Sequence, residues 1–138
     1  MTKKQQKIES GLYLQGRTFE GEKSYAEAAG QYEKILKANA SHINASNRLM
    51  IVYRKLKLYA KESALISKAI AAHEKDMEEK QHKWINEHSE MAELSRPLAR
   101  SLGLLTSKGL PVQENELLNK WKLRKAVVVK KLKQDKKS

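Results

Sequence analysis

The four histidines are the first side chains to consider for chemistry, because imidazole binds metals and transfers protons near neutral pH. They are His42, His73, His82 and His88. His82 and His88 are six residues apart and would lie on different faces of a helix, whereas a metal-binding pair on one helix is spaced i, i+4. Glu78 and His82 have that spacing, but the charged residues around them are typical of a solvated face. We therefore expect no metal site.

The sequence also lacks the residues that other kinds of catalytic site require. The chain has no cysteine, which excludes a thiolate metal site and a disulfide framework. No glycine-rich loop precedes a predicted helix to hold a phosphate group, and no nucleophile is accompanied by an ordered base. The sequence therefore predicts a protein that is not an enzyme and needs no cofactor.

Basic side chains gather at the two ends of the chain. Of the formal net charge of +12, residues 1–7 contribute +3 and residues 119–138 contribute +8, which leaves +1 for the rest. Such a segment attracts phosphate groups or acidic proteins, and it equally serves only to keep a chain soluble. The side chains that would contact phosphate are Lys120, Lys122, Arg124, Lys125, Lys130 and Lys131.

The length and the apolar pattern limit the class of protein. The 138 residues suit a single domain, which we place at residues 8–130. No apolar run follows the basic first residues, so no secretory signal is predicted. No stretch approaches the roughly 20 apolar residues of a membrane-spanning helix. We expect a soluble cytoplasmic protein with no membrane span.

The segment 8–36 predicts a helical hairpin. Ile8, Leu12 and Phe19 share one face of a first helix, which Gly21 can end. Ser24, with Glu27 three positions later, has the pattern of a capping box for a second helix. The apolar stripe of that second helix consists of Tyr25, Ala28, Tyr32, Ile35 and Leu36.

The segment 41–70 predicts a second hairpin. Ser41 can cap a helix that carries Ile43, Met50, Tyr53 and Leu56. After a short break near Lys57, another helix carries Tyr59, Leu65, Ile66, Ala69 and Ile70. Because the turns between these helices are short, we expect neighbouring helices to be antiparallel.

The pattern changes from about residue 74. Large apolar residues seven apart predict a longer helix at about 77–103, with Trp84 in the core; they are Met77, Trp84, Met91 and Leu98. Ser107–Pro111 is a turn signal. A last helix is expected at about 112–130, although the β-branched run Val127–Val129 weakens its end. Residues 131–138 are predicted to be a basic disordered tail.

The two hairpins are similar to each other at a fixed period. The segment SYAEAAGQYEKIL begins at Ser24, and LYAKESALISKAI begins 34 residues later at Leu58. A period of 34 residues is that of the tetratricopeptide repeat, a helix–turn–helix unit. The first unit, about residues 9–42, resembles that family at its large, small and aromatic positions, which are Leu12, Gly16, Phe19, Tyr25, Ala28 and Tyr32. Small residues at such positions let two helix axes approach closely.

The second unit, about residues 43–76, resembles the family less closely. Tyr53, Tyr59 and Ala69 match expected residue types, whereas Met50 occupies the small-residue position and Glu62 stands where a buried alanine is usual. The resemblance therefore covers about two degenerate repeats over residues 9–76. It implies an all-α fold of antiparallel hairpins from an α-solenoid, with a long third-layer helix and a C-terminal capping helix.

The resemblance also implies a function. In this family the first helices of the repeats line a concave groove that binds a peptide or protein segment. The corresponding residues here are Tyr13, Arg17, Asn47, Ile51 and Arg54, and Gln81 and His88 would continue the groove if the third layer keeps the register. Since guanidinium groups grip carboxylates in pairs of hydrogen bonds, an acidic segment would suit the two arginines.

Three hypotheses for function remain open. The first is a non-catalytic adaptor or scaffold that binds a protein segment in the groove. The second is a nucleic-acid-associated protein whose basic C-terminal helix contacts phosphate. The third is a structural domain that associates with itself, as a homo-oligomer.

Trp121 stands between Lys120 and Lys122 and fits each of these hypotheses. An amphipathic helix with tryptophan on one face binds acidic membranes, a partner's groove or nucleic acid. It also folds back to cap its own domain with the indole buried and the lysines in water, and we favour that arrangement.

Overall fold

The computed structural model describes residues 2–90, 93, 96–97 and 116–137, with side chains up to residue 134. This part of the chain contains five helices and no strand, which confirms the all-α class. The helices are α1 (Lys3–Gly21), α2 (Tyr25–Ala38), α3 (Ile43–Lys55), α4 (Tyr59–Glu87) and α6 (Glu116–Lys137). Their arrangement as a tetratricopeptide solenoid stays a prediction.

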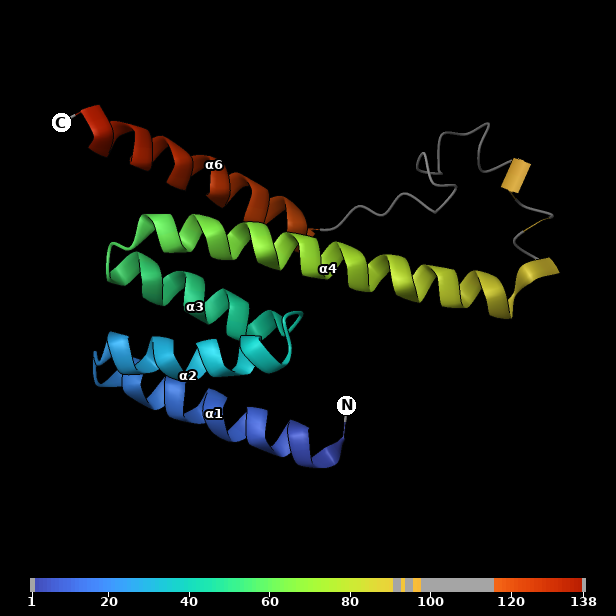
Figure 1. The fold of residues 1–138 in the computed structure, drawn as a ribbon, viewed down its shortest axis with the longest axis horizontal. Coiled ribbons are helices and arrows are strands. Elements are labelled where there is room, and N and C mark those ends of the chain that lie inside the picture. The colour runs from blue at the N-terminus through green and yellow to red at the C-terminus, as the bar shows by residue number, and fades with distance from the viewer. Residues whose placement is uncertain (1, 91–92, 94–95, 98–115, 138) are drawn as a thin grey trace.

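The helices stack in chain order. Figure 1 shows α1, α2, α3 and α4 side by side, each antiparallel to the one before, with α6 on the far side of α4 and antiparallel to it. The expected antiparallel neighbours are therefore present. The stack places the N-terminal helix and the basic C-terminal helix at opposite edges of the molecule.

The 34-residue period recurs in the backbone of the turns. α1 ends at Gly21 and α3 at Lys55, while α2 begins at Tyr25 and α4 at Tyr59. Between them, Lys23 (φ 60°) and Lys57 (φ 58°) have the left-handed conformation that commonly ends helices. In both turns the next residue donates its amide hydrogen to a carbonyl five positions earlier, at 2.8 Å and 2.9 Å. The sequence repeat thus corresponds to one turn geometry used twice.

The first hairpin packs its apolar stripe against α3. Ala28, Tyr32, Ile35, Leu49 and Val52 are all at most 1% exposed and belong to one core cluster. Within the hairpin, Gly16 lets α1 lie close to α2, because a Cβ at this position would lie 2.6 Å from the Tyr32 ring. This is the role that the sequence suggested for a small residue in α1.

The second core cluster joins α3 and α4 to α6. It contains Met50, Ile66, Leu118, Trp121 and Val128, each at most 7% exposed. Trp121 is 4% exposed, so α6 covers its own domain with the indole buried, as we favoured. Val128 is fully buried within the helix despite the β-branched run around it.

The longer helix expected from about residue 77 does not begin as a separate helix. α4 is one helix of 29 residues, about 43 Å long at 1.5 Å per residue. Its second half extends past the N-terminal end of α3, as Figure 1 shows. Trp84 lies on this projecting part and is 49% exposed, so its predicted place in the core is wrong. The reason is that α3 is too short to cover it; its ring stacks instead on His88, with the ring centroids 4.6 Å apart.

The helix ends also differ from the expected ones. α6 continues to Lys137 through most of the segment predicted to be a disordered tail. His42 rather than Ser41 caps α3, because its Nδ1 accepts a hydrogen bond from the Ala45 amide at 3.1 Å. Ser24 precedes α2 as expected, but its side chain makes no capping hydrogen bond.

Several predicted features lie outside the described residues. They are Met91, Leu98, the turn Ser107–Pro111 and the expected start of the last helix at residue 112. Among the helices that the structure describes, none combines the length and the apolar character needed to cross a membrane.

Candidate interaction surfaces

An open groove runs between α2 and α4, with α3 as its floor. It encloses about 450 Å³. Its apolar floor and walls are formed by Leu36, Ala40, Leu49, Tyr53, Ala64, Leu65 and Ala69. On α4 the lining residues 61, 64, 65, 68 and 69 recur at spacings of three and four, so a single helix face forms that wall. We call this surface the α2–α4 groove.

The rim of the α2–α4 groove is basic. Lys37 lies on α2, Lys61 and Lys68 lie on α4, and all three are exposed. Glu33 is the one acidic side chain among the residues lining the groove. It accepts a hydrogen bond from the Tyr53 hydroxyl at 2.6 Å. Burial, together with this bond and the charge of Glu33, raises the pKa of Tyr53.

The partner-binding residues that the repeat resemblance implied on α3 do not line the α2–α4 groove but lie on another face of that helix. On α3, Asn47, Ile51 and Arg54 are turned by more than 90° about the helix axis from the groove floor at Leu49 and Tyr53. Asn47 accepts a hydrogen bond from the Trp121 indole at 2.8 Å. The chain's own α6 therefore contacts part of the surface that was expected to bind a partner.

Arg54 is engaged with a buried carboxylate. Glu62 is fully buried, and its Oε2 lies 3.3 Å from Nη2 of Arg54. Arg124 from α6 grips both oxygens of Glu62, through Nε at 2.8 Å and Nη2 at 3.1 Å. The hydrogen bond to Glu62 raises the pKa of Arg124 although burial acts in the opposite direction. Arg124 is thus a structural residue that joins α6 to α4.

The two α1 residues of the expected groove have internal contacts as well. The Tyr13 ring is half-buried, with its centroid 5.8 Å from that of Tyr32. Arg17 lies 3.6 Å from Glu20, and nearly half of its side chain is exposed. The structure brings neither residue together with Asn47 or Arg54 through a contact that we observe.

Glu20 is the centre of a polar cluster that links three helices. It accepts hydrogen bonds from the hydroxyl of Tyr32 and from Arg48, whose Nη2 lies 2.5 Å away. Burial alone would raise the pKa of Glu20, but these bonds and the charges of Arg48 and Arg17 lower it. Burial and the bond to Glu20 raise the pKa of Tyr32. The cluster holds α3 against the first hairpin.

Some of the candidate phosphate-binding residues are exposed to solvent, and others contact residues of the chain itself. Lys120 and Lys130 are exposed on α6, and Lys125 is half-buried. Lys122 lies 3.6 Å from Glu74, and Lys131 lies over the ring of Tyr59, 4.9 Å from its centroid. Lys122 and Lys125 line one open hollow beside Ile70, whereas Arg124 is turned to Glu62 and Lys131 to Tyr59, so the six side chains do not share a single site.

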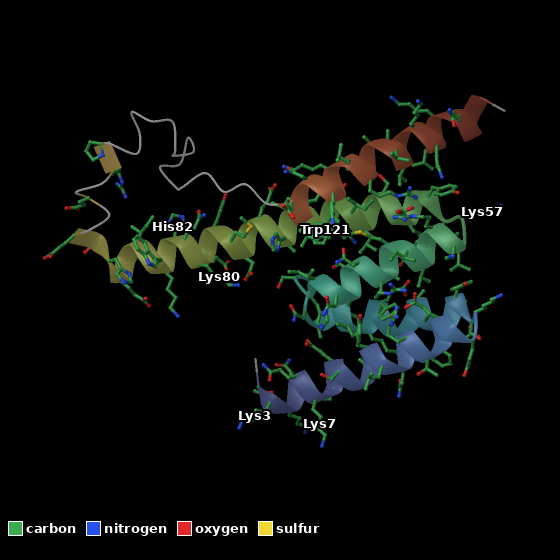
Figure 2. The ribbon with its side chains drawn as sticks, turned by 180° about the vertical axis from the view of Figure 1, so that it is seen from behind. Lys3, Lys7, Lys57, Lys80, His82 and Trp121 are labelled. Carbon is green, nitrogen blue, oxygen red and sulfur yellow. The ribbon has the colours of Figure 1, made fainter. Side chains whose placement is uncertain are left out.

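The N-terminal lysines do not extend this basic surface. Figure 2 shows Lys3 and Lys7 on α1, across the helix stack from Trp121 and α6. It also shows Lys80 and His82 on the projecting part of α4. Lys80 lies 3.1 Å from Asp76 within the same helix. The basic ends of the sequence are therefore separate surfaces in the fold.

No group of three metal-ligating side chains gathers anywhere in the described part of the chain. Gln81 and His88, which would have continued the concave groove, lie on and just after the projecting end of α4.

Sequence reasoning missed the α2–α4 groove. Its rim lysines on α4, Lys61 and Lys68, are seven residues apart, which is a helical face spacing visible in the sequence. Ala64 lies between them and is small, and in the fold its face of α4 is uncovered. The ion pair between Glu62 and Arg124 was also missed, although a glutamate at a position expected to be buried requires a cationic partner.

No known family model, curated protein or solved structure matches this chain.

Proposed function

We propose that this protein is a non-catalytic interaction module that binds a segment of another protein in the α2–α4 groove. The observation that carries the proposal is the groove itself, open, apolar at its floor and about 450 Å³ in volume. A groove of this size accepts apolar side chains of a partner, and such burial provides most of the energy of protein recognition.

The contacts of α6 support this choice over the surface implied by the repeat resemblance. Trp121 and Arg124 engage Asn47 and the carboxylate that Arg54 also contacts, so two of the expected binding residues already have internal partners. Leu49 and Tyr53, at the floor of the groove, are turned by more than 90° about the axis of α3 from Asn47, which contacts α6.

A photo-crosslinking experiment tests the proposal. Benzoylphenylalanine is placed at Ala64 in the groove or, as a control, at Ala126, an exposed alanine on α6 that does not line it. Each protein is irradiated in lysate with and without nuclease, and crosslinked peptides are identified by mass spectrometry. We expect a discrete protein partner from position 64, resistant to nuclease and absent from position 126.

Two outcomes contradict the proposal. Adducts that disappear after nuclease treatment favour the nucleic-acid hypothesis, in which the exposed lysines of α6 contact phosphate. Crosslinks only between copies of this chain favour the self-association hypothesis.

A further inference from the structure

We infer that the occupant of the α2–α4 groove is an acidic amphipathic α-helix. The inference rests on the proposed function and adds the class of partner. It follows from three features of the groove: its walls, its rim charges and its mostly helical backbone.

The walls of the groove fit a helix. α2 and α4 both pack on α3, so an additional helix laid between them contacts two helices at once. Packed helices lie about 8–10 Å apart, and side chains at i, i+3, i+4 and i+7 then face the groove. The small, exposed side chain of Ala64 leaves room for larger apolar residues from the partner.

The rim charges select an acidic helix. Lys61 and Lys68 are seven residues apart on one face of α4, about 10 Å along the helix axis. Carboxylates spaced by seven residues on a partner helix repeat at the same distance. Lys37 supplies a positive charge from the opposite wall, whereas Glu33 is held by Tyr53. The net charge of the lining is therefore positive, which favours acidic partners and disfavours basic ones.

The backbone of the groove disfavours an extended segment. A strand-like peptide needs unpaired backbone groups on its receptor to satisfy its own N–H and C=O groups. Most lining residues lie within α2, α3 and α4, where the backbone groups bond to one another. Leu36 and Lys37 are in the last turn of α2, and Ala40 follows that helix. A helical partner satisfies its backbone internally and needs only side-chain contacts from this surface.

Binding of a designed probe tests this inference. The probe is a fluorescein-labelled peptide of Leu, Ala and Glu, with leucines on one helical stripe and glutamates seven residues apart on its flanks. Two control peptides carry either lysine for every glutamate or two central prolines that prevent a helix. Fluorescence anisotropy with the full chain is expected to show saturable binding of the probe that weakens with salt. Both control peptides should bind at least about tenfold more weakly, a margin that corresponds to about 1.4 kcal/mol.

A pair of charge-reversal variants locates the site. Lys61→Glu combined with Lys68→Glu should weaken binding of the probe by about tenfold or more. Lys3→Glu combined with Lys7→Glu makes the same change in net charge at exposed positions on α1, across the helix stack from α6. Because these positions lie outside the groove, the affinity should change by less than about threefold. All four substitutions are at exposed sites, and circular dichroism checks that each variant is folded.

The results separate this inference from the proposed function. If position 64 captures a protein but the probe does not bind, or the proline peptide binds as well, the acidic helix is wrong and the adaptor function stands. Equal loss of affinity in both double variants means that only net charge attracts the probe, which also overturns the inference. If position 64 captures no protein, the proposed function itself fails.

Discussion

Gly16 carries the close contact between α1 and α2. A side chain at this position would meet the ring of Tyr32, which is fully buried and fixed by its hydrogen bond to Glu20. At the equivalent point of the second hairpin, 34 residues later, Met50 and Ile66 replace the glycine and the tyrosine. Both are buried in the second core cluster. A small–large pair in one hairpin is thus replaced by two side chains of intermediate size in the other.

Substitution of Gly16 tests this contact. Gly16→Ala gains about 1 kcal/mol of helix propensity but forces a Cβ into the Tyr32 ring, which costs about 1–3 kcal/mol. We expect net destabilisation in urea unfolding. Gly11→Ala is the matched control, because no neighbouring atom lies within 4 Å of its Cβ position. This variant should be more stable than the native protein by up to about 1 kcal/mol. Equal stabilisation of both variants would contradict the packing argument.

Glu20 should make stability depend on acid pH. Its pKa in the folded protein lies below its ordinary value, so the carboxylate stabilises the fold at pH values above about 4.3, the pKa of an unfolded glutamate. This contribution is lost as the pH falls through the folded pKa. We expect Glu20→Gln to lower the unfolding free energy at pH 7 by about 2 kcal/mol and to flatten its decline between pH 5 and pH 3. Urea unfolding over this range measures both effects, and parallel pH curves would show that Glu20 is not responsible.

At the scale of the helices, α6 depends on one aromatic anchor and one ion pair. Trp121 packs edge-on against His73, with ring centroids 5.9 Å apart, and donates its indole hydrogen to Asn47. Arg124 adds the grip on Glu62 one turn later. The other face of α6 carries Leu123, which is 70% exposed. The helix therefore has a docking face and an uncovered face.

A comparison of Trp121→Ala with Leu123→Ala tests whether only the docking face of α6 contributes to stability. Loss of a buried tryptophan costs about 3–5 kcal/mol, so hydrogen exchange of the α6 amides should accelerate and urea stability should fall. Leu123→Ala, on the exposed face of the same helix, is expected to change stability by less than about 0.5 kcal/mol. If the two variants exchange at the same rate, α6 is not held by its tryptophan.

For the whole molecule, α6 completes the second core. Met50, Ile66 and Ala69 share a buried cluster with the apolar face of α6, and Glu62 has Arg124 as its closest ionic partner. Without α6 the stack ends in an uncovered apolar surface and a carboxylate paired only with Arg54. A contiguous exposed apolar surface favours association of protein molecules with one another.

Truncation tests the role of α6 in the whole molecule. A chain that ends at residue 115 is expected to lose thermal stability and to associate at micromolar concentration in sedimentation velocity, whereas the full chain provides the reference. A truncated chain that stays monomeric with an unchanged Tm would show that the first four helices form a complete core.

The sequence by itself determined that the first four segments are amphipathic helices and which of their faces are apolar, although not the length of α4 or the caps of α2 and α3. Periodic apolar residues specify amphipathic helices because burial acts on one face at a time, and the 34-residue period specified the same turn at Lys23 and Lys57. The close contact at Gly16 also followed from local residue type, whereas for Trp121 the residue pattern favoured an inward position among several alternatives. These features depend on neighbours along the chain or on a single buried face.

Only the tertiary structure decided which surfaces are covered. Trp84 has the pattern of a core residue but is exposed, because α4 extends beyond α3. Arg124 has the pattern of a phosphate ligand but turns to Glu62, which lies 62 residues earlier. The α2–α4 groove depends on three helices that meet in space. Burial and ion pairing between distant residues depend on how helices pack, and the periodicity of one helix contains no information about the length or charge of its neighbour.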